Sequence, residues 1–334
     1  MYIITGAAGF IGSNIVAQLN DRGIKDIICV DRFRDGNKWL NLRGLQYFRF
    51  IHADDFLQPE VLDDLFEDGV TGVYHMGACS STTERDVDFL MQNNVEYSQI
   101  LFTYCTHFDV PICYASSAAT YGAGENGYDD NEKEISKLMP LNAYGYSKQL
   151  MDEWVLAQTK TPVKWYGVKF FNVYGPNEEH KGSMRSVVSQ AYKQIQDANK
   201  VKLFKSHHPD YTDGGQLRDF VYVKDVVRAM LDLMETDHAG KNGIYNLGTG
   251  KARSFKDLAE ATFKALDKEI NIQYIDMPEA LQGQYQYFTE ANMKKLKTAL
   301  PTFEFHELEE GVKDYVQNYL ATPIPYLNTR SNRG

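Results

Sequence analysis

The chain has 334 residues, with 35 basic and 45 acidic side chains, a formal net charge of −10, and apolar residues at 43% of its positions. This length is typical of two domains, or of one large domain that carries a smaller lobe. Because the chain is acidic and has no long run of Lys and Arg, it offers no surface for neutralising the phosphates of DNA or RNA. We therefore expect no nucleic-acid partner, and any anionic ligand must meet a local positive site.

The sequence also lacks the features of export, membrane insertion and metal binding. It starts directly on a strand pattern, without the basic segment and cleavage site of a signal peptide. No apolar run approaches the ~20 residues that a membrane span requires. The cysteines at 29, 79, 105 and 113 lack the spacings of zinc sites, and the histidines of the long loop 206–215 are interpreted as solvated. We expect a cytoplasmic protein with no metal site and no membrane partner.

Strand-length apolar runs alternate with helical patterns through the first half of the chain. The pattern predicts helices over 10–21, 87–108 and 144–158. Predicted strands cover 2–5, 26–30, 47–52, 72–76, 112–116 and 164–171. Such alternation is the signature of a doubly wound parallel sheet covered by helices, an α/β fold.

The pattern changes after about residue 172, where loops rich in Gly, His and Asp separate short strands and helices. We interpret 1–172 as a dinucleotide-binding domain, to which a segment at about 216–250 returns. Residues 173–320 are predicted to form a smaller α/β lobe that binds the substrate. Residues 321–334 have no periodicity and are predicted to be a disordered tail.

A glycine loop follows the first predicted strand and opens the first predicted helix. Gly6 permits a tight turn, Gly9 lets backbone N–H groups approach a pyrophosphate, and Gly12 lets the helix pack closely on the strand. The helix N-terminus adds partial positive charge at the same place. This arrangement predicts a dinucleotide site, since an acidic residue, Asp31, ends the second strand 19 residues after Gly12.

The residues after the second strand carry two opposite signals about the cofactor. Asp31 is suited to bind a ribose hydroxyl, which favours NAD. Arg32, with Lys38 nearby, is suited to a 2′-phosphate, which favours NADP. Alternatively, Arg32 and Lys38 are solvated side chains of a loop that bind no ligand. The pattern therefore leaves the choice between NAD and NADP open.

A second motif predicts proton transfer. Tyr144 and Lys148 are four residues apart at the start of a helix, so they share one face. A nearby ammonium stabilises a phenolate, which makes a tyrosine useful as a base near neutral pH. Ser117 ends the fifth strand, where ligands bind in open α/β sheets, and its hydroxyl is suited to hold a substrate oxygen beside Tyr144.

Taken together, the glycine loop, Ser117 and the Tyr144-to-Lys148 motif resemble the extended short-chain dehydrogenase/reductase family, which has a Rossmann-type fold and acts on nucleotide sugars. Dehydratases of this family are expected to carry Asp-Glu after the catalytic hydroxyl residue, and this chain has Ala118-Ala119, which argues against dehydration. The segments 77–84, 171–176 and 180–184 resemble the epimerases that act on an ADP-linked heptose.

The resemblance implies a reaction that oxidises and re-reduces one carbon of the sugar, in the synthesis of the lipopolysaccharide core. Such an epimerase needs a second acid/base group, and Lys181 matches it. The alternative interpretation of Lys181 is a solvated lysine of a loop, or a lysine that neutralises the diphosphate of the ligand. The implied cofactor is tightly bound NADP, with NAD as the alternative, and the implied assembly is a homo-oligomer, a pentameric ring. One departure is Ala53, where the family tends to have a lysine near the 2′-phosphate.

The candidate site residues follow from these motifs and from the resemblance. The catalytic set is Ser117, Tyr144, Lys148 and Lys181. The candidate cofactor contacts are Gly6, Gly9, Phe10, Ile11, Gly12, Asp31, Arg32, Lys38, Met76, Gly77, Ala78, Cys79, Ser80, Asn93, Tyr144, Lys148, Val173 and Lys181. The candidate substrate contacts are Ser117, Asn172, Ser183, Gln190, Phe204, Lys205, Ser206, His207, Arg218 and Tyr285. Arg218 is the expected diphosphate partner because a guanidinium binds phosphate in a bidentate fork.

Two other functions remain open at this point. A nucleotide-hexose 4-epimerase of the same family would use Ser117, Tyr144 and Lys148 but would not need Lys181. A dinucleotide-sensing protein would keep the fold without turnover, although the intact Tyr144 and Lys148 pair argues against it.

Overall fold

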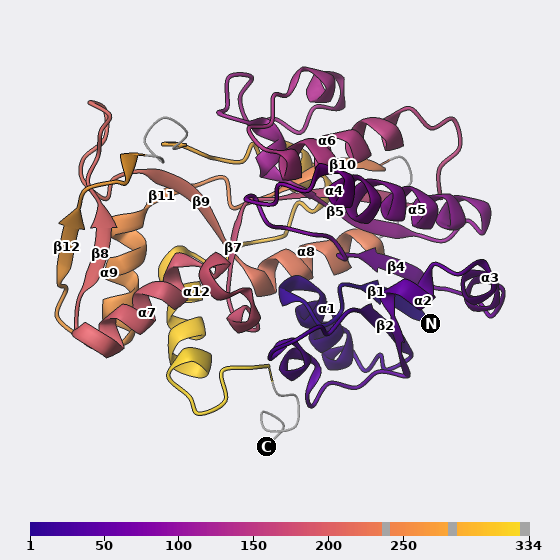
Figure 1. The fold of residues 1–334 in the computed structure, drawn as a ribbon, viewed down its shortest axis with the longest axis horizontal. Helices are drawn as coiled ribbons and strands as arrows, with labels where there is room; N and C mark the ends of the chain where they lie inside the picture. Colours follow the sequence, from indigo (N-terminus) through magenta and orange to yellow (C-terminus); the bar gives the residue numbers. More distant parts are fainter. Residues whose placement is uncertain (236–240, 280–285, 328–334) are drawn as a thin grey trace.

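A seven-stranded parallel sheet forms the centre of the molecule (Figure 1). The computed structural model describes residues 1–235, 241–279 and 286–327. The sheet has the order β10-β6-β5-β4-β1-β2-β3. Its strands are β1 (Tyr2–Thr5), β2 (Ile27–Asp31), β3 (Arg49–His52), β4 (Gly72–His75), β5 (Ile112–Ser117), β6 (Trp165–Phe170) and β10 (Gly243–Leu247). The predicted Rossmann-type fold is confirmed, and the strand order reverses between β1 and β4, where such sheets bind ligands.

Helices cover the two faces of this sheet. They are α1 (Phe10–Asp21), α2 (Ala53–Phe56), α3 (Pro59–Glu67), α4 (Val87–Leu90), α5 (Tyr97–His107), α6 (Ala143–Leu156) and α8 (Val223–Glu235). Short helical turns are η1 (Lys38–Leu42), η3 (Ala118–Tyr121) and η4 (Glu132–Lys137). The six strands and the helix 10–21 predicted from the sequence are all present, with strand ends displaced by two residues or fewer.

The predicted helix over 87–108 is interrupted by the π-helical turn η2 (Met91–Glu96). A π-turn inserts an extra residue into a helix, and such turns occur often at functional sites. Within this one, the buried Asn94 side chain accepts from the Cys79 amide at 2.8 Å and donates to the Cys79 carbonyl at 3.0 Å. The turn therefore fixes the backbone that follows β4, which hydrophobic periodicity alone did not indicate.

Two smaller sheets and a second group of helices form the other end of the molecule, at the left of Figure 1. One sheet has the order β11-β9-β7, and the other pairs β12 with β8. Their strands are β7 (Asn172–Tyr174), β8 (Val201–Phe204), β9 (Leu217–Tyr222), β11 (Ala252–Ser254) and β12 (Ile272–Ile275). The helices are η5 (Glu179–Met184), α7 (Val187–Ala198), α9 (Phe255–Ala265), α12 (Leu308–Tyr315) and η6 (Val316–Leu320). The helix α11 (Lys294–Ala299) packs instead against β10 of the central sheet. Within the segment 216–250, β10 joins the central sheet whereas β9 pairs with β7 and β11.

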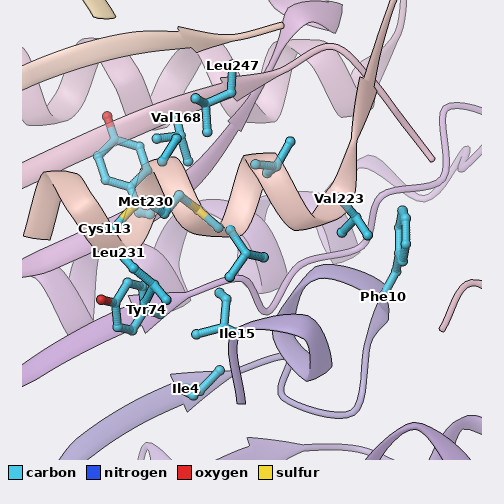
Figure 2. Close-up of a cluster of buried hydrophobic side chains, with 14 of the residues drawn as sticks. Ile4, Phe10, Ile15, Tyr74, Cys113, Val168, Val223, Met230, Leu231 and Leu247 are labelled. Atoms are coloured by element: carbon cyan, nitrogen blue, oxygen red, sulfur yellow. The ribbon is translucent and has the colours of Figure 1, made fainter. Parts of the chain in front are cut away.

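The largest hydrophobic core lies around α8, which crosses the central sheet (Figure 2). Met230 and Leu231 are fully buried between the sheet and α1, against residues such as Ile15 and Val168. This packing explains why a helix from the second half of the chain belongs structurally with the first half.

The last described residues do not extend away from the fold. The Leu327 amide donates a hydrogen bond to the Asn177 side chain at 2.9 Å, and Leu327 packs against the core. Residues 328–334 of the predicted tail lie outside the described residues. Among the described helices, none is long and apolar enough to cross a membrane.

Candidate active site

One cavity of about 770 Å³ opens at the carboxyl ends of the central strands, within the size range of ligand pockets. Its walls come from segments far apart in the sequence, including the glycine loop, the end of β2, the end of β4, α6 and η5. Every residue in the candidate cofactor set of the sequence lines it. The fold therefore brings this whole set to one place.

The glycine loop has the shape that a dinucleotide requires. Gly6 has φ +64°, and a Cβ there would lie 2.8 Å from the Gly77 backbone nitrogen at the end of β4. A Cβ on Gly12 would lie 2.8 Å from the Gly6 carbonyl carbon, so the helix could not pack so closely on the strand. The N-terminus of α1 borders the cavity at Phe10. These glycines leave a cradle that fits the pyrophosphate of a dinucleotide.

Two ion pairs stand at the end of the cavity beside β2. The Lys38 ammonium lies 2.5 Å from Asp31, whose carboxylate also accepts from the Ala8 amide at 2.8 Å. The Arg32 guanidinium lies 2.5 Å from Asp54 and donates to Asn93 at 3.1 Å. Hydrogen bonding from Arg32 lowers the pKa of Asp54. Both cations predicted to meet a 2′-phosphate therefore already have a carboxylate partner.

The helix α6 carries the predicted proton-transfer pair. Asn142 caps it by accepting from the Gly145 amide at 2.8 Å, which starts the helix one residue before Tyr144. Lys148 is buried and donates to the Ala115 carbonyl at 2.9 Å. Burial raises the pKa of Tyr144, and the hydroxyl of Ser117 opposes that shift. Burial also lowers the pKa of Lys148 to about 8, with Asp152 opposing.

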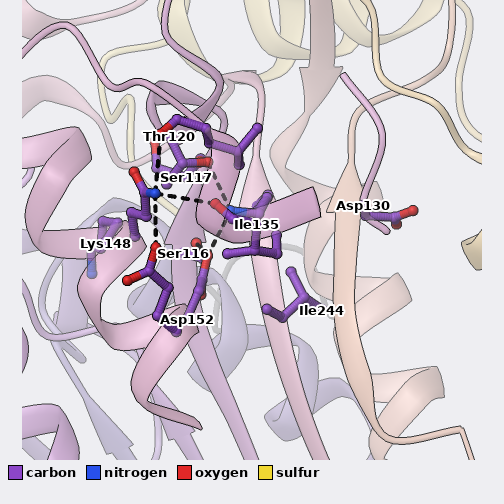
Figure 3. Close-up of polar contacts among 12 residues, drawn as sticks. Ser116, Ser117, Thr120, Asp130, Ile135, Lys148, Asp152 and Ile244 are labelled. Atoms are coloured by element: carbon purple, nitrogen blue, oxygen red, sulfur yellow. Dashed lines mark hydrogen bonds and ion pairs between the residues drawn. The ribbon is translucent and has the colours of Figure 1, made fainter. Parts of the chain in front are cut away.

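A buried polar network lies beside Lys148 (Figure 3). Asp152 accepts from Ser116 at 2.7 Å and from Lys169 at 2.6 Å, and neither charged side chain has any exposed surface. Lys169 also donates to Thr120 at 2.7 Å, and Thr120 donates to the Ser117 carbonyl at 2.8 Å. The network thus joins the helix that carries Lys148 to the turn that presents Ser117.

Lys181 reaches the same cavity from another wall. It lies on η5, where Gly182 adopts φ +57° and breaks the turn, and its ammonium is 5.2 Å from the centre of the Phe10 ring. Burial lowers the pKa of Lys181, and Glu178 opposes this shift. The arrangement places a partly desolvated amine and a tyrosine on two walls of one cavity, which suits proton transfer at two positions.

Several candidate substrate residues lie near a second cavity of about 670 Å³ over α7 and β8. Gln190 and Phe204 line it, together with Gln216 and Phe255. Arg218 is 8% exposed, and its guanidinium carbon lies 5.6 Å from the centre of the Phe255 ring. Arg218 thus contacts a residue of this cavity wall without lining the cavity itself, and it donates to the carbonyls of Leu217 and Gln286.

Of the residues that the structure describes, the other candidate substrate residues, apart from Ser117, line neither cavity. Lys205 pairs with Asp276 at 3.0 Å, the Ser206 amide donates to Asp213, and the His207 amide donates to Tyr287. Asn172 and Ser183 are exposed, and Tyr285 lies outside the described residues. In the loop 206–215, His208 stands 3.7 Å from Asp210, and no group of three metal-ligating side chains occurs among the described residues.

The cavity also contains residues that the sequence did not single out individually. Ser81, Glu84 and His180 line it and belong to segments already recognised as motifs. Phe89 and Tyr97 line it from the α4-to-α5 region, where an apolar periodic position gives no sign of facing a ligand. The buried Lys169 likewise has no signal in the sequence, since its partner Asp152 is on another element.

Comparison with known proteins identifies the family. The family model described as the NAD dependent epimerase/dehydratase family matches residues 2–248. The chain belongs to this family. A curated relative from Fusobacterium nucleatum, named ADP-L-glycero-D-manno-heptose-6-epimerase, is 53% identical over 98% of this chain and 100% of its own length. Members of the family bind a nicotinamide dinucleotide, which agrees with the cradle at the glycine loop.

Solved structures of the family have the same fold. The Helicobacter pylori ADP-L-glycero-D-manno-heptose-6-epimerase superposes with a TM-score of 0.80, at 30% identity, covering 96% of each chain. A UDP-glucose 4-epimerase from Thermus thermophilus, in complex with NAD, gives a TM-score of 0.71 at 25% identity, covering 93% of this chain and 96% of the other. The fold is thus shared by family members with different sugar substrates.

Proposed function

We propose that the protein epimerises C6 of ADP-D-glycero-β-D-manno-heptose to give ADP-L-glycero-β-D-manno-heptose, in the synthesis of the lipopolysaccharide core. The observation that carries the proposal is the position of Lys181 in the cavity that also holds Tyr144, Lys148 and Ser117. Relatives at 52–53% identity carry the name of this heptose epimerase, which supports the same substrate. The Ala118-Ala119 pair favours epimerisation over dehydration.

In the proposed mechanism the glycine loop with Gly6, Gly9 and Gly12 would hold a nicotinamide cofactor, which would supply the hydride chemistry: removal of a hydride from C6 and its return to the other face. Tyr144, as a phenolate that the Lys148 ammonium stabilises, takes the proton of the C6 hydroxyl of one epimer and becomes a phenol. Ser117 holds the same oxygen by a hydrogen bond. Once C6 is a carbonyl, rotation about the C5–C6 bond presents the other face.

Lys181 completes the reaction by giving a proton to the C6 oxygen after this rotation. It acts from η5, whereas Tyr144 acts from α6, so each residue serves one of the two epimers. The lowered pKa of Lys181 makes its ammonium a stronger acid than that of an exposed lysine, and in the reverse direction it leaves more neutral amine to act as a base. The hydride removed from C6 returns to C6, and the C6 oxygen loses one proton to Tyr144 and gains one from Lys181. One turnover therefore leaves Tyr144 as the phenol and Lys181 as the neutral amine, and transfer of one proton from Tyr144 to Lys181 through solvent restores the starting state.

The test is incubation of the purified holoenzyme with ADP-D-glycero-β-D-manno-heptose, followed by NMR of the C6 proton. Appearance of the L-glycero epimer, up to an equilibrium mixture, is the expected result. Complete retention of the starting C6 configuration would overturn the proposal. UDP-glucose serves as the comparison substrate, and inversion at C4 of that sugar would instead support a hexose 4-epimerase.

The second cavity is proposed to bind the ADP part of the substrate. Gln190 and Phe204 on its wall suit the polar edge and the flat face of an adenine, and Arg218 beside it suits the diphosphate. The first cavity then remains for the dinucleotide and the sugar. The protein is also proposed to be a cytoplasmic homo-oligomer. Light scattering of the purified protein measures the molar mass of the assembly and so tests the oligomeric state.

We propose that the resident cofactor is NADP, with NAD as a weaker ligand. Lys38 neutralises the Asp31 carboxylate that would otherwise repel a 2′-phosphate, and Arg32 stands beside it on the same wall. We expect Arg32→Gln to weaken NADP binding by about 10- to 100-fold, the cost of losing a charged hydrogen bond. The affinity for NAD is the internal control and should change little.

The measurement begins with mass spectrometry of the nucleotide released from the denatured protein. Titration of cofactor-free wild type and Arg32→Gln with NADP and NAD follows, with binding read from protein fluorescence. Released NAD, together with equal losses of both affinities in the variant, would contradict NADP preference.

The proposed role of Lys148 predicts the pH dependence of the reaction. Its pKa of about 8 means that the ammonium is present below pH 8 and lost as the pH rises through that value. Because the charge stabilises the Tyr144 phenolate, we expect kcat/KM to fall above about pH 8. Lys148→Arg keeps its charge throughout, so its slower reaction should lack this fall. The same fall in the arginine variant would assign the titration to another group.

A further inference from the structure

The loop that carries Lys181 is closed by one buried carboxylate. Glu178 has no exposed surface and stands just before η5, while Ser186 caps α7 just after it. Both the hydroxyl and the amide of Ser186 donate to Glu178, at 2.5 Å each. The two ends of the loop are therefore joined at Glu178, and the shape of the loop between them depends on this contact.

A third donor to Glu178 comes from the C-terminal part of the chain. The hydroxyl of Tyr315, the last residue of α12, donates to Glu178 at 3.0 Å, and Tyr315 is 1% exposed. A buried carboxylate is costly unless donors surround it. Tyr315 thus helps to keep a charged group at the base of the loop.

Asn177 provides a second anchor at the same end of the loop. It is fully buried and adopts φ +75°, a conformation that costs free energy unless the surroundings hold it. Its side chain donates to Ser13 on α1 at 2.9 Å and accepts from the Leu327 amide at 2.9 Å. Its carbonyl accepts from Asn41 at 3.0 Å. The C-terminal segment therefore contacts both residues that precede η5.

The residues Tyr315–Leu327, called the C-terminal clasp below, include none of the residues that line the two cavities described above. Two hydrogen bonds connect the clasp to the start of the Lys181 loop: Tyr315 donates to Glu178, and the Leu327 amide donates to Asn177. Lys181 stands three residues after Glu178, and its charge also interacts with that carboxylate. The clasp is thus placed to set the position of Lys181 without touching a ligand.

We propose that the C-terminal clasp positions Lys181 for proton transfer, acting through Glu178 and Asn177. The segment predicted to begin a disordered tail is then part of the active-site architecture. This inference rests on the proposed function, in which Lys181 serves one epimer and Tyr144 the other. It predicts that loosening the clasp impairs the half-reaction of one epimer only, because Tyr144 lies on α6 and keeps its own supports.

The experiment compares Tyr315→Phe and a chain ending at Ala321 with two matched controls. Tyr319→Phe removes a hydroxyl of the same segment that interacts with Lys224 and not with Glu178. A chain ending at Leu327 keeps both anchors. Single-turnover oxidation of each C6 epimer is followed by the absorbance of the reduced nicotinamide, and KM is measured separately. Thermal unfolding of each variant shows whether it is folded.

We expect both test variants to slow the oxidation of one epimer by about 10- to 100-fold, as misplacement of a catalytic group by about 1 Å does, with KM nearly unchanged. The other epimer and both controls should react at the wild-type rate. Hydrogen exchange, measured by mass spectrometry without substrate, should become faster in peptides covering 177–186 and stay unchanged over 143–156.

Each other outcome has a definite meaning. Equal slowing of both epimers would assign the clasp a general structural role and overturn the proposal. Wild-type rates in both test variants would overturn it as well, while leaving the proposed function intact. If the wild-type protein oxidises neither epimer, the proposed function fails, and the positioning of Lys181 for this reaction fails with it. If Tyr315→Phe does not fold, the shortened chain decides the result.

Discussion

Lys181→Met is expected to lower the rate of C6 epimerisation by about 10²- to 10⁴-fold, the range that a positioned acid/base group contributes. Met fills a similar volume and can keep the contact with the Phe10 ring while removing the amine. The variant should still oxidise the epimer served by Tyr144, so single-turnover reduction of the cofactor persists for one epimer. Tyr144→Phe should show the reverse selectivity.

The matched control is Lys137→Met, which removes an exposed lysine that pairs with Glu134 on the surface. It should leave epimerisation of both substrates unchanged. NMR of the C6 proton, run in both directions, measures the loss. A hexose 4-epimerase would not need Lys181, so full activity of Lys181→Met would exclude the proposed mechanism.

Lys169→Met is expected to destabilise the folded protein by about 3–5 kcal/mol, because it leaves the Asp152 carboxylate buried without its counter-ion. Both side chains have no exposed surface, so water cannot replace the lost partner. The hydroxyls of Ser116 and Tyr114 still donate to Asp152, at 2.7 and 3.1 Å, but they carry no positive charge. The free energy of unfolding in urea measures the effect.

The double variant Lys169→Met with Asp152→Asn should recover most of this loss, because a neutral amide oxygen still accepts from Ser116. Removing the exposed pair Lys137 and Glu134 should cost less than about 1 kcal/mol. A cost below about 1 kcal/mol for Lys169→Met alone would contradict the expected penalty for a buried carboxylate that has lost its counter-ion. The recovery in the double variant separates lost charge from lost packing.

The dinucleotide cradle could be predicted because the residues that form it are close together in the sequence. Gly6 and Gly9 lie between β1 and α1, Gly12 lies in the first turn of α1, and the close contacts at Gly6 and Gly12 in the structure are the ones that this order requires. Tyr144 and Lys148 were predictable for the same reason, since four residues make one helical turn. The candidate cofactor set consequently gathers in one cavity.

The substrate side was less predictable because its residues are arranged by loops and short strands. Lys205 and Ser206 follow β8 and were expected to contact the substrate, yet they pair with Asp276 and Asp213. Arg218 lies within β9 and stacks on Phe255, which neither a motif nor a periodicity indicated. The direction of a loop side chain depends on neighbours that are distant in sequence.

The chain is acidic and has no basic run, yet the local spacing of its residues alone determined three features. These are the doubly wound sheet, the anion site at the N-terminus of the first helix, and the helix that carries Tyr144 and Lys148. These features depend on residues within one or two turns of each other, where sequence distance and spatial distance agree. Only the tertiary structure decided the pairs Lys169 with Asp152 and Tyr315 with Glu178, 17 and 137 residues apart. Such pairs form because folding buries the two side chains together, and burial depends on the packing of the whole molecule. The contacts that hold the predicted catalytic residues in place could therefore be found only in the tertiary structure.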